Sequence, residues 1–228
     1  MKTFACFDAS NTSLTCDMKY AMNSHDDKRY RFNLLRGNLM NSSVQKFGAH
    51  ATSFSRASKI FAKKKFYPST KGMRGPGVYF WEKTAVSDRL CLLWYRQQFS
   101  AGKYGADSDK GCSVVDAVLS CHKDEYLNLD DEHVNMKLME WTKQIESNEK
   151  MSTKLQSGIF IRFYQDIERH NGGKKFKLVR ARVSAPYDPD KIYPRWSGLP
   201  VCYIVRDTDV IMITGLRQVI CEADYVNI

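Results

Sequence analysis

Two short segments of the chain combine side chains that could hold a flat, charged ligand. The first is His50-Ala51-Thr52, and the second is a glycine-proline-glycine corner at residues 75–77 that leads directly into an aromatic strand. Glycine lets the backbone turn tightly and approach a ligand closely. Tyr79, two residues beyond the last glycine, would then present its ring at the mouth of a site.

A third segment, residues 202–207, reads Cys-Tyr-Ile-Val-Arg-Asp and begins with the apolar run of a buried strand. The nicotinamide ring of NAD is a flat cation. It needs an aromatic face and a pair of amide partners to fix its orientation. The three segments together predict a nicotinamide-binding cleft.

The elements that must position these residues follow from the periodicity of apolar side chains. Alternation predicts a strand at residues 44–50, and Ser53 can cap a helix that runs to residue 64. Further strands are expected at 78–81, 113–119, 176–183, 201–205, 210–213 and 219–223, with helices from 84, from 130, at 155–169 and at 30–39. This mixed order of short strands and helices favours an α+β domain over a doubly wound parallel sheet.

The composition predicts a soluble globular protein with a sizeable core. Of its 228 residues 43% are apolar, and no run approaches the roughly 18 apolar residues that a membrane helix needs. Asp8 interrupts any apolar region of a signal peptide almost at once. We therefore expect a cytoplasmic protein, with a nuclear location as the alternative and no membrane partner.

The seven cysteines are scattered, and no two form a CxxC pair. The nearest approach to a metal cluster is Cys112, Cys121, His122 and His133, whose spacing fits no standard zinc pattern. Reduced, mostly buried thiols are therefore the expectation, and no metal site is predicted.

The net charge of +10 favours anionic partners such as nucleic acid, a dinucleotide or an acidic protein surface. Basic residues concentrate at 63–65, 71–74 and 174–182, and the first two groups flank the glycine corner. That placement suggests phosphate near the site. A solvated basic surface without a specific partner is the other interpretation.

The order of these segments resembles the ADP-ribosyltransferases of the diphtheria-toxin and poly(ADP-ribose) polymerase type. In that family a first strand carries His-Gly-Ser/Thr, a Gly-x-Gly-x-Tyr-Phe strand follows, and a late strand reads Glu-Tyr-Ile-Val-Tyr-Asp or similar. The resemblance covers roughly residues 44–95 and 176–215. It implies a split mixed or antiparallel sheet with flanking helices over residues 43–228, a helical insertion around 120–170, and an N-terminal extension at 1–42.

The resemblance also implies NAD as co-substrate and assigns a role to each matching residue. His50 would bind a ribose hydroxyl and the adenosine side of NAD, and Tyr79 would stack on nicotinamide. Ser87, eight residues after Tyr79, and the backbone of Ala51 would bind the nicotinamide amide. The cofactor-binding residues are then His50, Ala51, Thr52, Gly77, Tyr79 and Ser87, and the catalytic positions are His50, Tyr79 and Cys202.

Two positions depart from the family pattern. Ala51 stands where a glycine is usual, and Cys202 stands where polymerising members carry a glutamate. A neutral thiol stabilises a developing positive charge poorly, so chain elongation is not expected. The expected activity is mono-ADP-ribosyl transfer from NAD to a protein or nucleic-acid acceptor. The alternatives are an inactive module that binds NAD or ADP-ribose and a basic nucleic-acid-binding protein.

Each residue taken alone also has a structural interpretation. His50 can be a histidine satisfied within the fold, Tyr79 a core aromatic, Ser87 a first-turn serine and Cys202 a small buried hydrophobe. Their joint order and spacing favour the nicotinamide site.

Overall fold

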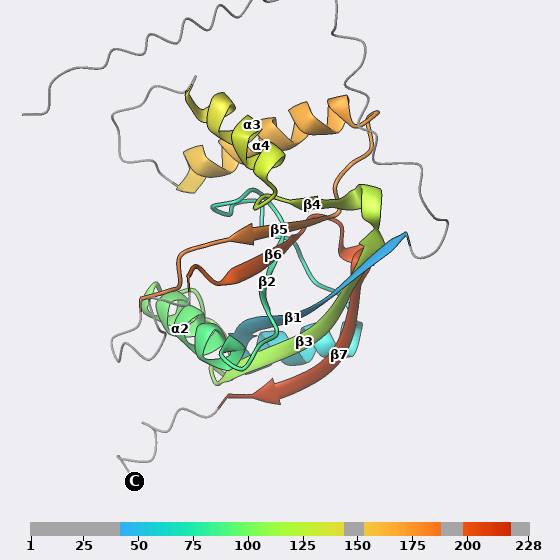
Figure 1. Ribbon diagram of the computed structural model, residues 1–228. Helices are drawn as coiled ribbons and strands as arrows, with labels where there is room; N and C mark the ends of the chain where they lie inside the picture. Colours follow the sequence, from blue (N-terminus) through green and yellow to red (C-terminus); the bar gives the residue numbers. More distant parts are fainter. Residues whose placement is uncertain (1–41, 144–152, 188–197, 220–228) are drawn as a thin grey trace, which may run out of the picture. The chain divides into compact units, whose positions relative to one another are not determined.

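A seven-stranded mixed sheet organises the computed structural model, which describes residues 42–143, 153–187 and 198–219 (Figure 1). The strand order is β4-β5-β6-β2-β1-β3-β7, and every neighbouring pair is antiparallel except β4 with β5. The strands are β1 (Ser43–Ser53), β2 (Val78–Glu82), β3 (Cys112–His122), β4 (Tyr126–Asn128), β5 (Leu178–Arg182), β6 (Val201–Val205) and β7 (Ile211–Gln218). The helices are α1 (Phe54–Lys63), α2 (Ser87–Ser100), α3 (Glu132–Lys143) and α4 (Thr153–His170), with short 3-10 turns at Lys123–Glu125 and Thr208–Val210. The α+β class expected from the sequence is confirmed at this level.

The three segments singled out in the sequence lie on neighbouring strands at the centre of the sheet. β2, which follows the glycine corner, lies between β1 and β6. β1 pairs with β3 along its whole length, whereas β1 and β2 share only two registered pairs, Gly48 with Glu82 and Ala49 with Trp81. The sheet is therefore continuous rather than split, but it is weakly joined where β1 meets β2.

Alternate residues of the central strands enter two separate cores. Val78 and Phe80 of β2 pack with Tyr203 and Val205 of β6 on the face that α1 covers, and Ala57 of α1 belongs to the same cluster. Phe80 and Tyr203 are almost fully buried, at 0% and 1% exposure. Burial of a side chain of this size contributes roughly 1.5–3 kcal/mol to folding.

The intervening residues form a second cluster on the opposite face. Trp81 of β2 and Ile204 of β6 pack there with residues of α2 and α4. This two-residue period is the reason that the short apolar runs were recognisable as strands.

Several element boundaries differ from the sequence-based expectations. The strand expected at 210–213 is longer than expected: β7 begins at Ile211 and continues to Gln218, and its register against β3 shifts beside Gly215. The shift allows one strand to continue where the pattern suggested a break. β4 was not expected, and α2 begins at Ser87 rather than at Thr84. The expected helix at 30–39 and most of the strand at 219–223 lie outside the described residues.

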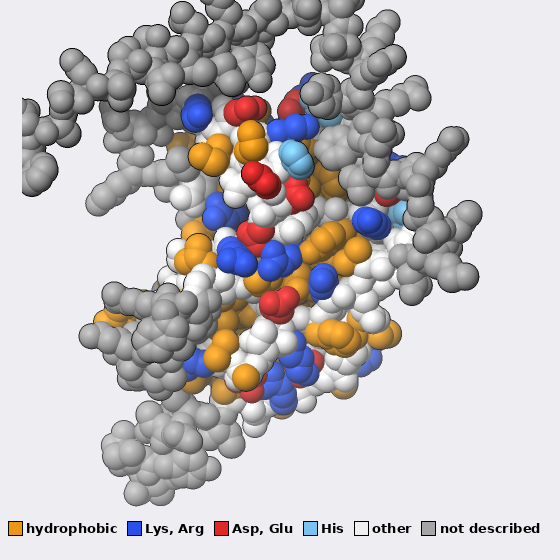
Figure 2. All heavy atoms as spheres, viewed as in Figure 1, with side chains coloured by type: hydrophobic (Ala, Val, Ile, Leu, Met, Phe, Trp, Pro, Cys, Tyr) orange, Lys and Arg blue, Asp and Glu red, His pale blue; other side chains and the backbone are white. Residues whose placement is uncertain are grey.

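The acidic stretch before α3 has a structural role. The side chain of Asp131 accepts hydrogen bonds from the amides of His133 and Val134 at 3.1 and 3.2 Å, as a helix cap does. On the molecular face in Figure 2, acidic and basic side chains are interspersed. None of the helices in the described ranges combines the length and the apolar character needed to cross a bilayer.

Candidate functional site

The candidate site lies where β1 and β2 part. Their ladder ends at the pair of Ala49 with Trp81, although both strands continue toward residues 50–53 and 78–80. The Phe47 carbonyl accepts a hydrogen bond from the amide of Lys83 at 3.0 Å, so β1 directs the backbone groups of residues 47, 49 and 51 toward β2. The amide and carbonyl of Ala51 therefore face the gap, available to a ligand rather than to a ladder.

A pocket of about 370 Å³ occupies this gap. It is lined by residues of β1, α1, the segment that leads to β2, β2 itself, α2 and the loop before β3. The lining residues are His50, Ala51, Thr52, Arg56, Lys59, Ile60, Phe66, Tyr67, Gly77, Val78, Tyr79, Trp94, Lys103 and Tyr104. Aromatic walls with a few polar and charged groups are typical of sites for small ligands and cofactors.

His50 is held in one orientation and one tautomer. Its Nδ1 donates to the carbonyl of Tyr79 at 2.8 Å, which leaves Nε2 as the acceptor of the ring. The ring also packs edge-on against Phe66, with ring centroids 5.2 Å apart. Burial lowers the pKa of His50, the hydrogen bond to Tyr79 opposes this, and nearby Lys103 lowers the pKa further. His50 is therefore neutral at physiological pH.

Tyr79 is held by the loop before β2. Its hydroxyl donates to the carbonyl of Gly75 at 2.5 Å and accepts from the amide of Arg74 at 3.1 Å. A side chain at Gly72 would collide with this hydroxyl, because a Cβ there would lie 2.2 Å from it. Burial raises the pKa of Tyr79 well above its ordinary value, so the hydroxyl stays protonated and continues to donate.

Gly77 is required by the neighbouring strand as well as by the pocket that it lines. Its φ of +153° is a conformation that other residues rarely adopt, and a Cβ would lie 2.7 Å from the carbonyl oxygen of Val205 in β6. The glycine corner thus allows β2 to pack closely on β6.

One side of the pocket is basic. Arg56, Lys59 and Lys103 line it, and no carboxylate is among the lining residues that the structure describes. Arg56 is oriented by Asp107, with Nε and Oδ2 2.8 Å apart, and by the carbonyl of Lys103, which accepts from Nη2 at 2.8 Å. Burial lowers the pKa of Lys103, and Arg56 adds to the effect, as expected for cations held close together. The site would therefore gain from an anionic ligand.

Tyr104 closes the pocket beneath this basic side. It is 2% exposed, its ring stacks on Tyr95 at 5.1 Å between centroids, and the guanidinium of Arg56 lies 5.1 Å from its ring centre. Burial raises the pKa of Tyr104 to about 12, while a hydrogen bond from Thr52 opposes the rise. Thr52 therefore contributes to the pocket wall partly through Tyr104.

The structure brings together five of the seven sequence-predicted site residues: His50, Ala51, Thr52, Gly77 and Tyr79. Ser87 and Cys202 are not among the described residues that line the pocket. Ser87 is 2% exposed, and its hydroxyl donates to the carbonyl of Thr84 at 2.9 Å. Cys202 is 3% exposed and pairs across the ladder with Trp81. Burial raises the pKa of its thiol to about 12, so it is neutral.

Sequence reasoning missed the basic side and four aromatic residues of the lining, Phe66, Tyr67, Trp94 and Tyr104. Arg56 lies in the first turn of α1, and Trp94 lies within α2, where an apolar helix position alone does not indicate a binding site. Lys103 and Tyr104 lie in a loop between two glycines, Gly102 and Gly105. That pairing of a cation with an aromatic residue in a glycine-bounded loop was the one available signal.

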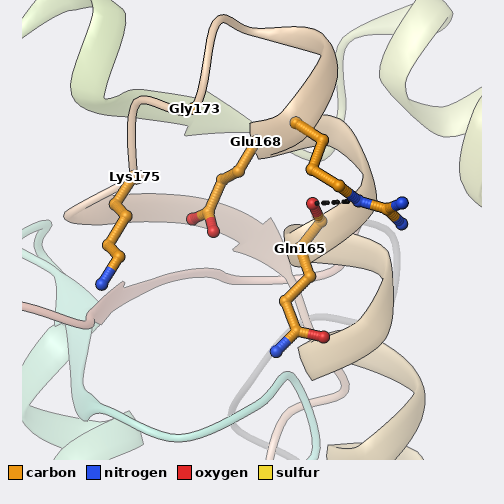
Figure 3. Close-up of a pocket in the computed structure, with 5 residues that line it drawn as sticks. Gln165, Glu168, Gly173 and Lys175 are labelled. Carbon is orange, nitrogen blue, oxygen red and sulfur yellow. Dashed lines mark hydrogen bonds between the residues drawn. The ribbon is translucent and has the colours of Figure 1, made fainter.

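A second hollow, of about 420 Å³, lies at the end of α4, and Figure 3 shows Glu168 between Lys175 and Gln165. The carboxylate of Glu168 already accepts from the amide of Phe176 at 2.9 Å and forms an ion pair with Arg206. This hollow is comparable in volume to the pocket between β1 and β2, but its carboxylate is engaged in holding α4 to the sheet. We therefore place the candidate site at the β1–β2 gap.

A comparison with protein-family models finds no family that matches the chain, and a search of curated proteins finds no matching relative. What the pocket binds is therefore inferred from its own residues.

Proposed function

We propose that the protein transfers a single ADP-ribosyl group from NAD to a macromolecular acceptor and releases nicotinamide. The observation that carries this proposal is the gap between β1 and β2. It gathers His50, Ala51, Thr52, Gly77 and Tyr79 around one aromatic pocket with a basic side. The same residues carry the sequence resemblance to an NAD site.

The nicotinamide end of NAD would lie at the parted strands. The backbone amide and carbonyl of Ala51 face the gap and match the two hydrogen-bonding groups of a carboxamide. Tyr79 would supply the aromatic face, fixed by the two hydrogen bonds of its hydroxyl. Ser87 would need to release its bond to Thr84 to take part, so we assign the amide contacts to Ala51 alone.

The remainder of the dinucleotide would extend along the basic side. The Nε2 of neutral His50 is an acceptor, suited to a ribose hydroxyl, and Arg56, Lys59 and Lys103 suit the diphosphate. A diphosphate would also relieve the mutual repulsion of these cations.

In the proposed reaction, the bond between C1′ of the ribose and the nicotinamide nitrogen breaks. Nicotinamide leaves as a neutral molecule with the bonding electron pair. A nucleophilic oxygen or nitrogen of the acceptor forms the new bond to C1′, and its proton passes to solvent. The pocket would contribute mainly by positioning, because the neutral thiol of Cys202 provides no charge to stabilise the oxocarbenium-like state.

The test is transfer of label from adenylate-labelled NAD, together with chromatographic measurement of free nicotinamide. We expect His50→Ala and Tyr79→Ala to abolish labelling, whereas His133→Ala, a change at an exposed histidine of α3, should leave it intact. Labelling that survives both pocket substitutions would refute the proposal.

The absence of a carboxylate among the described lining residues favours one second candidate, a module that binds NAD without cleaving it. Calorimetry separates the two possibilities. Binding of NAD that depends on His50 and Tyr79, with no release of nicotinamide over hours, would select the binding module.

A further inference from the structure

The positive charge of the chain has a single origin in the sequence. Between Asp27 and Glu82 there is no Asp or Glu, but there are twelve Lys and Arg residues. The rest of the chain carries 23 basic and 25 acidic residues, so this stretch alone produces the net charge of +10. Its described part includes α1 and the loop that leads into β2.

Five lysines of this stretch form what we call the basic rim, and all are exposed. They are Lys59, Lys63, Lys64, Lys65 and Lys71. Within residues 42–143, 153–187 and 198–219, no carboxylate lies within ion-pair distance of any of them. One or two cations at the C-terminal end of α1 would be enough to interact favourably with the negative end of the helix dipole. Of the five, Lys59 lies near enough to Asp107 to lower the pKa of that carboxyl, and five cations still exceed that need.

The basic rim is continuous with the pocket. Lys59 and Tyr67 belong to the pocket lining, and Tyr67 is 70% exposed. The Nζ of Lys65 lies 5.8 Å from the centre of the Tyr67 ring. At the end of α1, Lys64 adopts a left-handed conformation with φ of 51°, which turns the chain from the helix toward Tyr67. The lysines and an open aromatic ring thus lie on one path to the site.

Unpaired lysines beside an open aromatic ring suit a nucleic-acid strand with unpaired bases. The lysines would neutralise successive phosphates, and a base would stack on Tyr67. In a duplex the bases are stacked inside and could not use this ring. α1 has 10 residues, a length of about 15 Å, which spans only a few nucleotides and fits one strand crossing the rim.

We infer that the basic rim binds single-stranded nucleic acid and presents it to the pocket as the acceptor. The acceptor role rests on the proposed transferase function, whereas strand binding stands without it. In the transfer, a nucleophilic nitrogen or oxygen of the strand would form the bond to C1′ of the ribose. Nicotinamide would leave with the electron pair of the broken glycosidic bond, and the displaced proton would pass to solvent.

Binding is tested by fluorescence anisotropy of the full chain with a labelled 20-nucleotide single strand of mixed sequence, as DNA and as RNA, at several salt concentrations. We expect K63A/K64A/K65A to weaken binding at least ten-fold at low salt. It should also reduce the salt slope by about 2, since each phosphate contact to a single strand contributes about 0.7. The control K123A/K143A/R162A removes the same charge from exposed positions outside the rim and should change affinity less than three-fold.

Tyr67→Ala should weaken strand binding several-fold without changing the salt slope, because stacking releases no counterions. Equal losses in the rim and control variants would overturn the inference, since only net charge would then matter. Tighter binding of a duplex of the same sequence would overturn it as well.

Acceptor identity is tested by incubating protein, strand and adenylate-labelled NAD, followed by nuclease digestion. Label that co-migrates with the strand and becomes nuclease-sensitive supports the inference. Label found only on protein overturns the acceptor role while the transferase proposal stands. Strand binding without any nicotinamide release refutes the transferase and leaves the basic rim as a binding surface.

Discussion

Tyr164→Phe tests whether α4 holds Tyr79 in place. Tyr164 is 0% exposed, and its hydroxyl donates to the carbonyl of Arg74 at 2.7 Å. The loop that includes Arg74 and Gly75 holds the hydroxyl of Tyr79. The hydroxyl of Tyr164 therefore helps to hold the loop that orients Tyr79, together with the guanidinium of Arg74, which lies 5.0 Å from the ring centre of Phe160 in α4.

The expected size of the effect follows from what the substitution removes. Tyr164→Phe keeps the ring and leaves a half-buried carbonyl without its donor, which costs about 1–3 kcal/mol. If about 1.4 kcal/mol of this loss falls on the ordering of the loop, NAD affinity should decrease ten-fold. Packing of the ring against Phe160 and Phe163 should survive, so the fold should remain intact.

Two measurements separate loosening of the loop from loss of global stability. Trypsin cleaves after Arg74, so the rate of cleavage at this site reports opening of the loop without any ligand, and calorimetry reports NAD affinity. The matched control is Tyr203→Phe, which removes another buried hydroxyl that donates to Glu82 Oε1 at 2.5 Å, remote from the loop. Urea unfolding gives the loss of unfolding free energy in each variant, so that the two losses can be compared.

We expect faster cleavage after Arg74 and weaker NAD binding in Tyr164→Phe only. The reasoning is refuted if both variants lose similar stability and neither changes cleavage or affinity. It is also refuted if both change them equally, because the effect would then be global.

Three further predictions concern single residues. Because the folded-state pKa of His50 is lowered, its stabilising contribution is complete above about pH 6.5 and is lost as pH falls toward the folded-state pKa. The side chain of His50→Asn can still donate to the carbonyl of Tyr79 but does not titrate. In urea unfolding, the free energy of unfolding of His50→Asn should therefore depend less on pH between 7 and 5 than that of the wild type. Gly77→Ala should destabilise the fold by about 1–3 kcal/mol, because the residue has a positive φ and its new Cβ would clash with β6. The control Gly102→Ala, also at positive φ but with open space around it, should cost less. Equal losses of unfolding free energy in the two variants would contradict the close contact between Gly77 and β6. Cys202→Ala should leave transfer of label within two-fold of wild type, because the thiol is neutral, and a ten-fold loss would show that the sulfur takes part.

The sequence predicted the central strands well because their patterns are local. The alternation around Phe80 and Tyr203 needs only two buried faces, which the sheet provides. Gly77 was assigned to a tight turn near a ligand. Glycine is also required at position 77 because the backbone packs closely on Val205, more than a hundred residues later in the chain. This contact depends on the tertiary structure and has no local signal in the sequence.

The missed parts of the site have the same origin. Lys103 and Tyr104 reach the pocket from a loop whose position depends on the pairing of β3 with β1, a long-range contact. Ser87 was placed by its spacing from Tyr79, but spacing does not show that its hydroxyl bonds the preceding turn. Residues on strands were therefore easier to place than residues whose roles depend on loop paths or helix starts.

The charge of the pocket has a consequence for the proposed chemistry. Arg56, Lys59 and Lys103 favour binding of the NAD diphosphate, but each also opposes the positive charge that develops at C1′. At a separation of about 8 Å and an effective dielectric constant of about 20, the repulsion between one such cation and a unit positive charge at C1′ is about 2 kcal/mol. Asp107 offsets part of this charge through its ion pair with Arg56, but no carboxylate is among the described residues that line the pocket, so the site should bind NAD well and cleave it slowly. A polyanionic acceptor on the basic rim would bring phosphates near the reacting centre and supply part of the missing negative charge. On this reasoning a nucleic-acid strand should accelerate release of nicotinamide, and an uncharged oligonucleotide analogue of the same sequence should not.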